Sequence, residues 1–159
     1  MTNTSKADPV LIVTPIILSW IVTFLTGGVR TYNYQKAWFQ PPGWVFGLVW
    51  TALYVMFGFL LYESKRQEDY FTMGLVIGVL VLTYFWQFLF SYLKNYKLAI
   101  WELLVTLILG LILFVRLYDS EVVNNTGFGY GYIMIYVPFF AILLSTQTYK
   151  KGGSKKRRL

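Results

Sequence analysis

The chain has no cysteine and no histidine among its 159 residues, and only 13% of its side chains are charged. The missing cysteines exclude disulfide bonds and thiolate nucleophiles. Together with the missing histidines they also exclude the usual zinc sites and haem ligands. The sequence therefore offers few candidates for the familiar kinds of catalysis, and it predicts no metal site and no prosthetic cofactor.

What the chain has instead is apolar and aromatic side chains, at 57% and 20% of the residues. A soluble domain is typically about 25% charged, so this composition indicates a multi-pass membrane protein. Five apolar runs are about long enough to cross the hydrocarbon core of a bilayer. They cover residues 10–26, 44–62, 71–92, 98–115 and 128–149. We predict an all-α integral membrane protein, a bundle of five transmembrane helices forming one domain over residues 1–149, with a basic tail at 150–159.

The segments between these runs are polar. Residues 30–40 form a long aromatic loop, residues 63–69 read as a charged connector, and residues 116–126 are predicted to be irregular. The first run could be mistaken for a signal peptide, but Asp8 adjoins it and no small-residue cleavage site follows, so we reject that reading.

The most informative stretch joins the long loop to the second run. Pro41 and Pro42 stiffen the loop, Pro42 or Gly43 opens a helix, and the 19 residues 44–62 carry no charge. Aromatic residues recur along this helix at steps of four, four and three, which puts them on one face. They are Phe46, Trp50, Tyr54 and Phe57. Trp50 lies near mid-span, where an indole N–H needs a partner or a ligand, whereas Trp38, Trp44 and Tyr62 fit a membrane-interface belt.

These residues carry a family resemblance. The stretch W-F-Q-P-P-G-W-V-F-G-L-V-W-T-A-L-Y, residues 38–54, resembles the signature of the translocator protein family, the tryptophan-rich sensory proteins also called peripheral benzodiazepine receptors. Further matches are Leu82, Trp86, Phe90, Ala99, Glu102 and Pro138. The chain departs from the family pattern at three positions. Thr83 stands for an asparagine, Phe139 for a tyrosine and Ile142 for a tryptophan.

The resemblance implies a membrane receptor or carrier that binds tetrapyrroles such as porphyrin or haem as ligands, and sterols in animals. Two facing aromatic surfaces, from the second and third runs, would enclose a flat slot with the long loop as its lid. The implied ligand-binding residues are Trp38, Phe39, Phe46, Trp50, Tyr54, Thr83, Trp86, Phe90, Phe139 and Ile142. Residues 144–151 also fit the loose cholesterol pattern, with Leu144, Tyr149 and Lys151 as sterol contacts.

Two other functions stay open at this point. A porphyrin-degrading membrane enzyme would depend on the tryptophans, and we expect ligand binding to survive the loss of the fifth-run indole and phenol better than such breakdown would. A structural or regulatory membrane protein would use the same aromatic side chains only for packing. A coupled transporter is the weakest reading, because Glu102 alone lies inside a run.

The charges predict a topology. The net charge is +7, but six of the fourteen basic residues lie in the last ten positions, so we expect a topology signal and no nucleic-acid partner. Four basic residues fall on one side of the five spans and ten on the other. The positive-inside rule then places the C-terminus and the 30–40 loop in the cytosol. The family resemblance allows the mitochondrial outer membrane, the secretory pathway or a bacterial envelope.

Two further features carry expectations about packing and charge. Gly43 with Gly47, and Gly74 with Gly78, have the small-xxx-small spacing that allows close helix contact. Internal packing and a homodimer are both compatible with that spacing. Glu102 is expected to orient its helix from a position one turn inside the fourth run, where it reaches water or a basic partner such as Lys97.

Overall fold

The computed structural model describes residues 8–26 and 43–118, and this part of the chain is helical apart from short connections. Its helices follow the predicted runs. They are α1 (Val10–Leu25), α2 (Gly43–Arg66), α3 (Tyr70–Gln87), the π-helical segment η2 (Phe88–Tyr92) and α4 (Tyr96–Tyr118). The prediction of an all-helical membrane protein is confirmed for these residues. The fifth run, the 30–40 loop and the basic tail lie outside them.

Three of these helices are long and apolar enough to cross a membrane. They cover Gly47–Arg66, Tyr70–Tyr92 and Lys97–Tyr118, with 20, 23 and 22 residues. At 1.5 Å per residue each spans about 30 Å or more, the thickness of a hydrocarbon core. The 16 residues of α1 are apolar but cover only about 24 Å. The chain is therefore an integral membrane protein.

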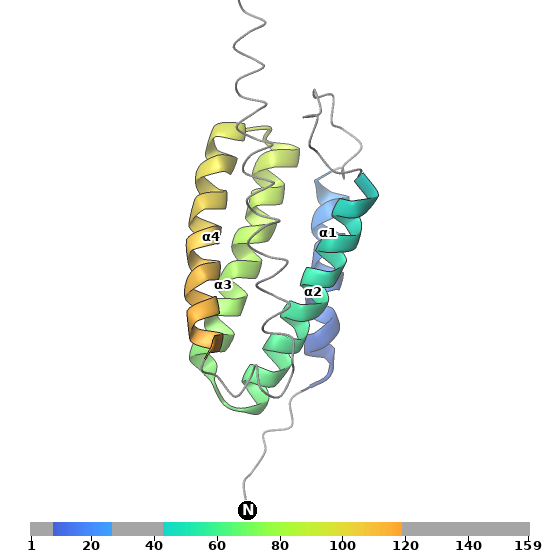
Figure 1. Cartoon of the computed structure of the whole chain (residues 1–159). Helices are drawn as coiled ribbons and strands as arrows, with labels where there is room; N and C mark the ends of the chain where they lie inside the picture. The colour runs from blue at the N-terminus through green and yellow to red at the C-terminus, as the bar shows by residue number, and fades with distance from the viewer. Residues whose placement is uncertain (1–7, 27–42, 119–159) are drawn as a thin grey trace, which may run out of the picture.

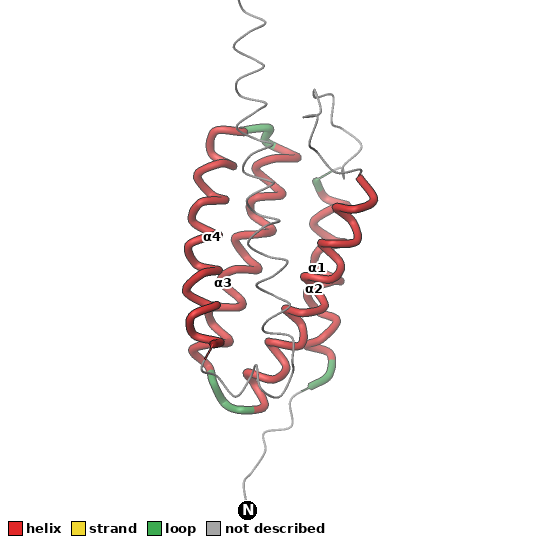
Figure 2. The backbone as a smooth tube through the Cα atoms, viewed as in Figure 1, coloured by secondary structure: helices red, strands yellow, loops and turns green. Residues whose placement is uncertain are grey.

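The helices run side by side in two pairs (Figure 1). Helix α1 packs on α2, α3 packs on α4, and α2 contacts α3 between the pairs. The α2–α3 and α3–α4 connections lie at opposite ends of the helices, so consecutive helices are antiparallel (Figure 2). Side chains buried in this arrangement come mainly from α2, α3 and α4, with Phe57, Leu53 and Leu60 among the largest.

The connections are shorter than the sequence predicted. Helix α2 continues through Arg66, so the charged connector is reduced to residues 67–69. Helix α4 likewise continues to Tyr118, so the start of the segment predicted to be irregular is helical. Charged side chains at both helix ends have partners. Arg66 pairs with Glu63 within α2 at 2.7 Å, whereas Arg116 of α4 pairs with Asp69, just before α3, at 3.5 Å.

Side-chain caps stabilise the N-termini of α3 and α4, which follow short connections. The Asp69 carboxylate accepts a hydrogen bond from the Thr72 backbone N–H at 3.1 Å, at the start of α3. Asn95 does the same for the Leu98 N–H at 3.2 Å, at the start of α4. Side-chain oxygens thus satisfy donors that a helix N-terminus would otherwise leave without partners.

Among the described glycines, the closest helix contact is at Gly58, which the sequence analysis did not select. A Cβ added at Gly58 of α2 would overlap the backbone carbonyl of Ile12 in α1 and lie 2.9 Å from the Ile12 Cα. Of the predicted glycine pairs, Gly78 faces α4, with Leu109 Cδ2 3.2 Å from an added Cβ. Gly47 and Gly74 have nothing within 4 Å. Gly78 therefore serves internal packing.

Candidate functional site

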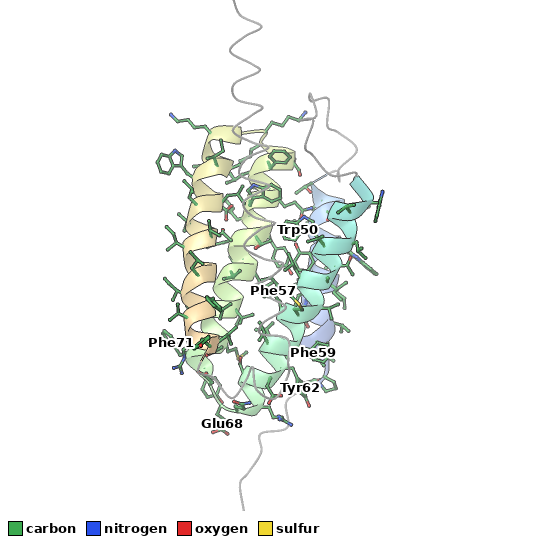
Figure 3. All side chains as sticks on the ribbon, viewed as in Figure 1. Trp50, Phe57, Phe59, Tyr62, Glu68 and Phe71 are labelled. Carbon is green, nitrogen blue, oxygen red and sulfur yellow. The ribbon has the colours of Figure 1, made fainter. Side chains whose placement is uncertain are left out.

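The aromatic face predicted on α2 points into the protein. Tyr54 and Phe57 are buried, with 5% and 0% of their surface exposed, and Trp50 is partly buried against the same core. Figure 3 shows Trp50 and Phe57 between α2 and α3. The side chain of the fourth member, Phe46, lies outside what the structure describes. The spacing of four, four and three residues thus predicted the inward face of α2 correctly for the three described side chains.

The face predicted on α3 is also buried. Thr83, Trp86 and Phe90 are 2%, 8% and 6% exposed. Helical spacing from Thr83 allows either Trp86 or Gln87 on this face. The structure assigns it to Trp86, because the Gln87 side chain turns to α1 and donates a hydrogen bond to the Thr23 hydroxyl at 2.8 Å.

The rings of these two faces form one continuous stack, which we call the aromatic series. Centroids are 5.2 Å apart between Phe90 and Trp86, 6.1 Å between Trp86 and Trp50, and 5.6 Å between Trp50 and Tyr54. Tyr84 continues the series at 5.6 Å from Tyr54. All four interplanar angles lie between 17° and 25°. Parallel rings at this spacing attract one another and offer flat apolar surfaces.

The series corrects the expected slot in one respect. Trp50 and Trp86 stack directly on each other across the α2–α3 contact. A flat ligand that binds between the two helices must therefore separate Trp50 from Trp86. It then replaces each ring as the stacking partner of the other. Such an exchange keeps ring-on-ring contact on both sides of the ligand.

Tyr84 is a member of the series that sequence reasoning missed. It lies one residue after Thr83, about 100° around the helix from the predicted face, so helical spacing excluded it. Its ring stacks on Tyr54, and its hydroxyl donates a hydrogen bond to the Pro15 carbonyl oxygen at 2.7 Å. The aromatic series is thus fixed to α1 as well as spanning α2 and α3. The only sign of Tyr84 in the sequence was that an aromatic residue adjoins the predicted face.

Glu102 does not have the surroundings that the sequence predicted. It is 7% exposed, and its Oε1 accepts a hydrogen bond from the Thr106 hydroxyl at 2.6 Å. Its Oε2 is buried without a hydrogen-bond partner among the described residues. The expectation of water or a basic partner is therefore wrong, because Glu102 faces the interior of the protein while Lys97 is exposed.

A cluster of charged side chains lies at the end of the bundle that holds the α2–α3 connection. Arg116 of α4 lies 3.5 Å from the Asp69 carboxylate, and its guanidinium stands 5.7 Å from the centre of the Phe71 ring. Partial burial opposes ionisation of Asp69, but hydrogen bonds from Thr72 and the charge of Arg116 outweigh it and lower the pKa of this carboxyl below its usual value. This end stabilises the fold and lies away from Trp50 (Figure 3).

Several predicted ligand contacts fall outside the described residues. They are Trp38 and Phe39 in the first loop, Phe139 and Ile142 in the fifth run, and the sterol contacts Leu144, Tyr149 and Lys151. For these residues the assignments stay predictions.

Comparison with known proteins agrees with the helical pattern. The sequence model described as the TspO/MBR family matches residues 11–149. The chain is also similar to the tryptophan-rich protein TspO of Archaeoglobus fulgidus, with 32% identity over a match that covers 45% of this chain and 50% of that relative. The matched region thus spans about half the length of that curated relative, whereas the family match takes in almost all of the chain.

Proposed function

Because this chain belongs to the TspO/MBR family, we propose that it is a membrane receptor or carrier for a flat, largely apolar ligand, either a tetrapyrrole such as porphyrin or haem, or a sterol. The ligand binds at the aromatic series between α2 and α3. We include in this proposed site the further contacts that the sequence predicts, which are Trp38, Phe39, Phe46, Phe139 and Ile142.

One observation carries this proposal. Five stacked rings from two different helices lie in a part of the chain that is long and apolar enough to cross a membrane. Packing alone is served by aliphatic side chains at other contacts of the core, such as Val76, Val79 and Leu103. A run of parallel rings adds flat faces that recognise a planar or rigid multi-ring molecule through stacking and apolar burial.

The test is a porphyrin titration of the purified protein, followed by tryptophan fluorescence. Micromolar binding corresponds to about −8 kcal/mol. Trp50→Ala removes the ring at the centre of the series, and we expect it to weaken binding by about 1 to 3 kcal/mol through lost stacking and burial.

Trp101→Ala is the matched control for this titration. Trp101 is 61% exposed on α4 and lies outside the aromatic series, so its loss removes one indole without changing the proposed site. We expect wild-type affinity from this variant. Equal affinity of wild type and folded Trp50→Ala would place the ligand elsewhere and leave the series a packing element.

We also propose that the C-terminus and the 30–40 loop face the cytosol, as the distribution of basic residues suggests. In sealed membrane vesicles that expose the cytosolic face, added protease should remove a C-terminal tag. A tag that is protected until detergent opens the vesicles would reverse the orientation. Imaging of a tagged copy in its own host would identify the membrane.

A further inference from the structure

Two buried polar atoms of α3 and α4 have no hydrogen-bond partner among the described residues. They are the indole Nε1 of Trp86 and the carboxyl Oε2 of Glu102, on side chains that are 8% and 7% exposed. A buried polar atom without a partner destabilises the folded protein, so each of these two atoms calls for an explanation.

The packing of α3 on α4 puts Trp86 and Glu102 at a similar height along the two helices. Gly78 of α3 faces Leu109 of α4. Trp86 comes eight residues after Gly78, and Glu102 comes seven residues before Leu109 on the antiparallel helix. Both steps are about 10 to 12 Å along the axis. Glu102 and Leu109 also share one face of α4, since they are two turns apart.

The neighbouring contacts leave both atoms available to a third group. Trp86 stacks on Trp50 and Phe90 through the faces of its ring, whereas Nε1–H lies in the ring plane at its edge. The Thr106 hydroxyl occupies only Oε1 of Glu102. The region thus presents a fixed donor on α3 and, at a similar height on α4, a carboxyl oxygen.

We propose that Trp86 and Glu102 form a polar site that binds one hydroxyl group of the ligand. The indole N–H donates to the hydroxyl oxygen, and the hydroxyl donates to Glu102 Oε2. A hydroxyl both donates and accepts, so it satisfies both atoms at once. A ligand carboxylate has acceptors only, so it accepts from the indole N–H but has no hydrogen to donate to Glu102 Oε2.

This inference depends on the proposed function, because the ring of Trp86 belongs to the aromatic series, and it selects between the two ligand classes proposed there. Sterols carry a hydroxyl at the end of a rigid apolar frame, whereas porphyrins carry carboxylates. The site therefore favours a sterol-type alcohol, with the frame against the rings and the hydroxyl between α3 and α4.

The experiment compares cholesterol with the matching hydrocarbon that lacks its hydroxyl group, in competition against one fluorescent sterol bound to the full chain in detergent. We expect wild type to prefer the alcohol about tenfold. Trp86→Phe keeps a stacking ring but loses the N–H, and Glu102→Leu keeps bulk but loses the oxygens. In both variants the ratio of the affinity for the alcohol to the affinity for the hydrocarbon should fall to about one.

Two controls keep the result specific. Trp101→Phe removes an exposed indole next to Glu102 and should leave the preference unchanged. Glu102→Gln keeps an acceptor and a donor and should retain most of the preference for the alcohol. If Glu102→Leu does not fold, the preference for the alcohol measured in wild type and in Trp86→Phe still tests the proposal.

The outcomes separate this inference from the proposed function. Equal binding of both compounds by wild type would overturn the hydroxyl site and indicate that water alone occupies it, while ligand binding itself would stand. Porphyrin binding with no sterol binding would also overturn it. Failure of both ligand classes to bind would overturn the proposed function.

Discussion

Helix α2 makes two contacts of opposite character. Toward α1 it presents Gly58, and the two backbones approach so closely that no side chain fits between them. Toward α3 it presents Trp50 and Tyr54, whose rings stack on Trp86 and Tyr84. The first contact keeps two helices at a fixed distance. The second holds them apart by the thickness of rings.

The difference between these contacts indicates which one can change. A backbone-to-backbone contact has one geometry, because neither chain can move aside. Stacked rings can exchange one flat partner for another at little loss of contact energy. We therefore expect the α1–α2 pair to act as the rigid part of the molecule and the α2–α3 contact to admit the ligand.

The largest expected effect comes from adding a methyl group at the rigid contact. Gly58→Ala places its Cβ against the Ile12 backbone and should destabilise the protein by about 3 kcal/mol, since a backbone cannot repack as a side chain does. Thermal unfolding in detergent, followed by circular dichroism, measures this loss.

Gly47→Ala is the matched control, because Gly47 lies in the same helix with nothing within 4 Å of an added Cβ. Both variants gain the helix propensity of alanine, about 1 kcal/mol, so the difference between them isolates the contact with α1. Equal stability of the two variants would show that α1 moves away readily, and the distinction between a rigid and an adaptable contact would be lost.

A smaller effect is expected at the charged end of the bundle, which belongs to neither contact. Asp69→Ala removes the cap of α3 and should cost about 1 kcal/mol at pH 7. Since the pKa of Asp69 is lowered in the folded protein, its carboxylate stabilises the fold above the unfolded pKa of about 4, and that contribution is lost as the pH falls through the folded value.

Unfolding curves of wild type and Asp69→Ala at pH 7 and at pH 3 test this sign. The gap between the two proteins should narrow at the lower pH, where the carboxylate becomes protonated and its interaction with Arg116 weakens. A gap that is wider at pH 3 would contradict the assigned direction of the shift.

The sequence predicted those parts of the fold that follow from local spacing. Uncharged runs gave the helices, and the recurrence of Trp50, Tyr54 and Phe57 gave the inward face of α2, because both depend only on helix geometry. The contacts of Gly58 and Tyr84 depend on where α1 lies, and one sequence contains no such information. The burial of Glu102 was missed for the same reason. The sequence shows how far Glu102 lies from the helix end. It does not show that the face that Glu102 shares with Leu109 packs against α3.

The π-helical turn at Phe88–Tyr92 was also beyond sequence reasoning. It leaves three consecutive residues, Leu89, Phe90 and Ser91, buried, which a regular helical pattern does not predict. Such turns are rare and are often found at functional sites. Here it carries Phe90, the end of the aromatic series.

The central claim is that the ligand binds at the aromatic series between α2 and α3, and photoaffinity labelling tests it most directly. A porphyrin and a sterol, each carrying a photoreactive group, are bound separately to the full chain in detergent and activated, and the labelled residues are identified by mass spectrometry. We predict labels within residues 50–57 and 83–90, which an excess of the same ligand without the photoreactive group should prevent. Labels confined to the exposed side of α4, at residues such as Trp101, Val105 and Ile108, would contradict the account.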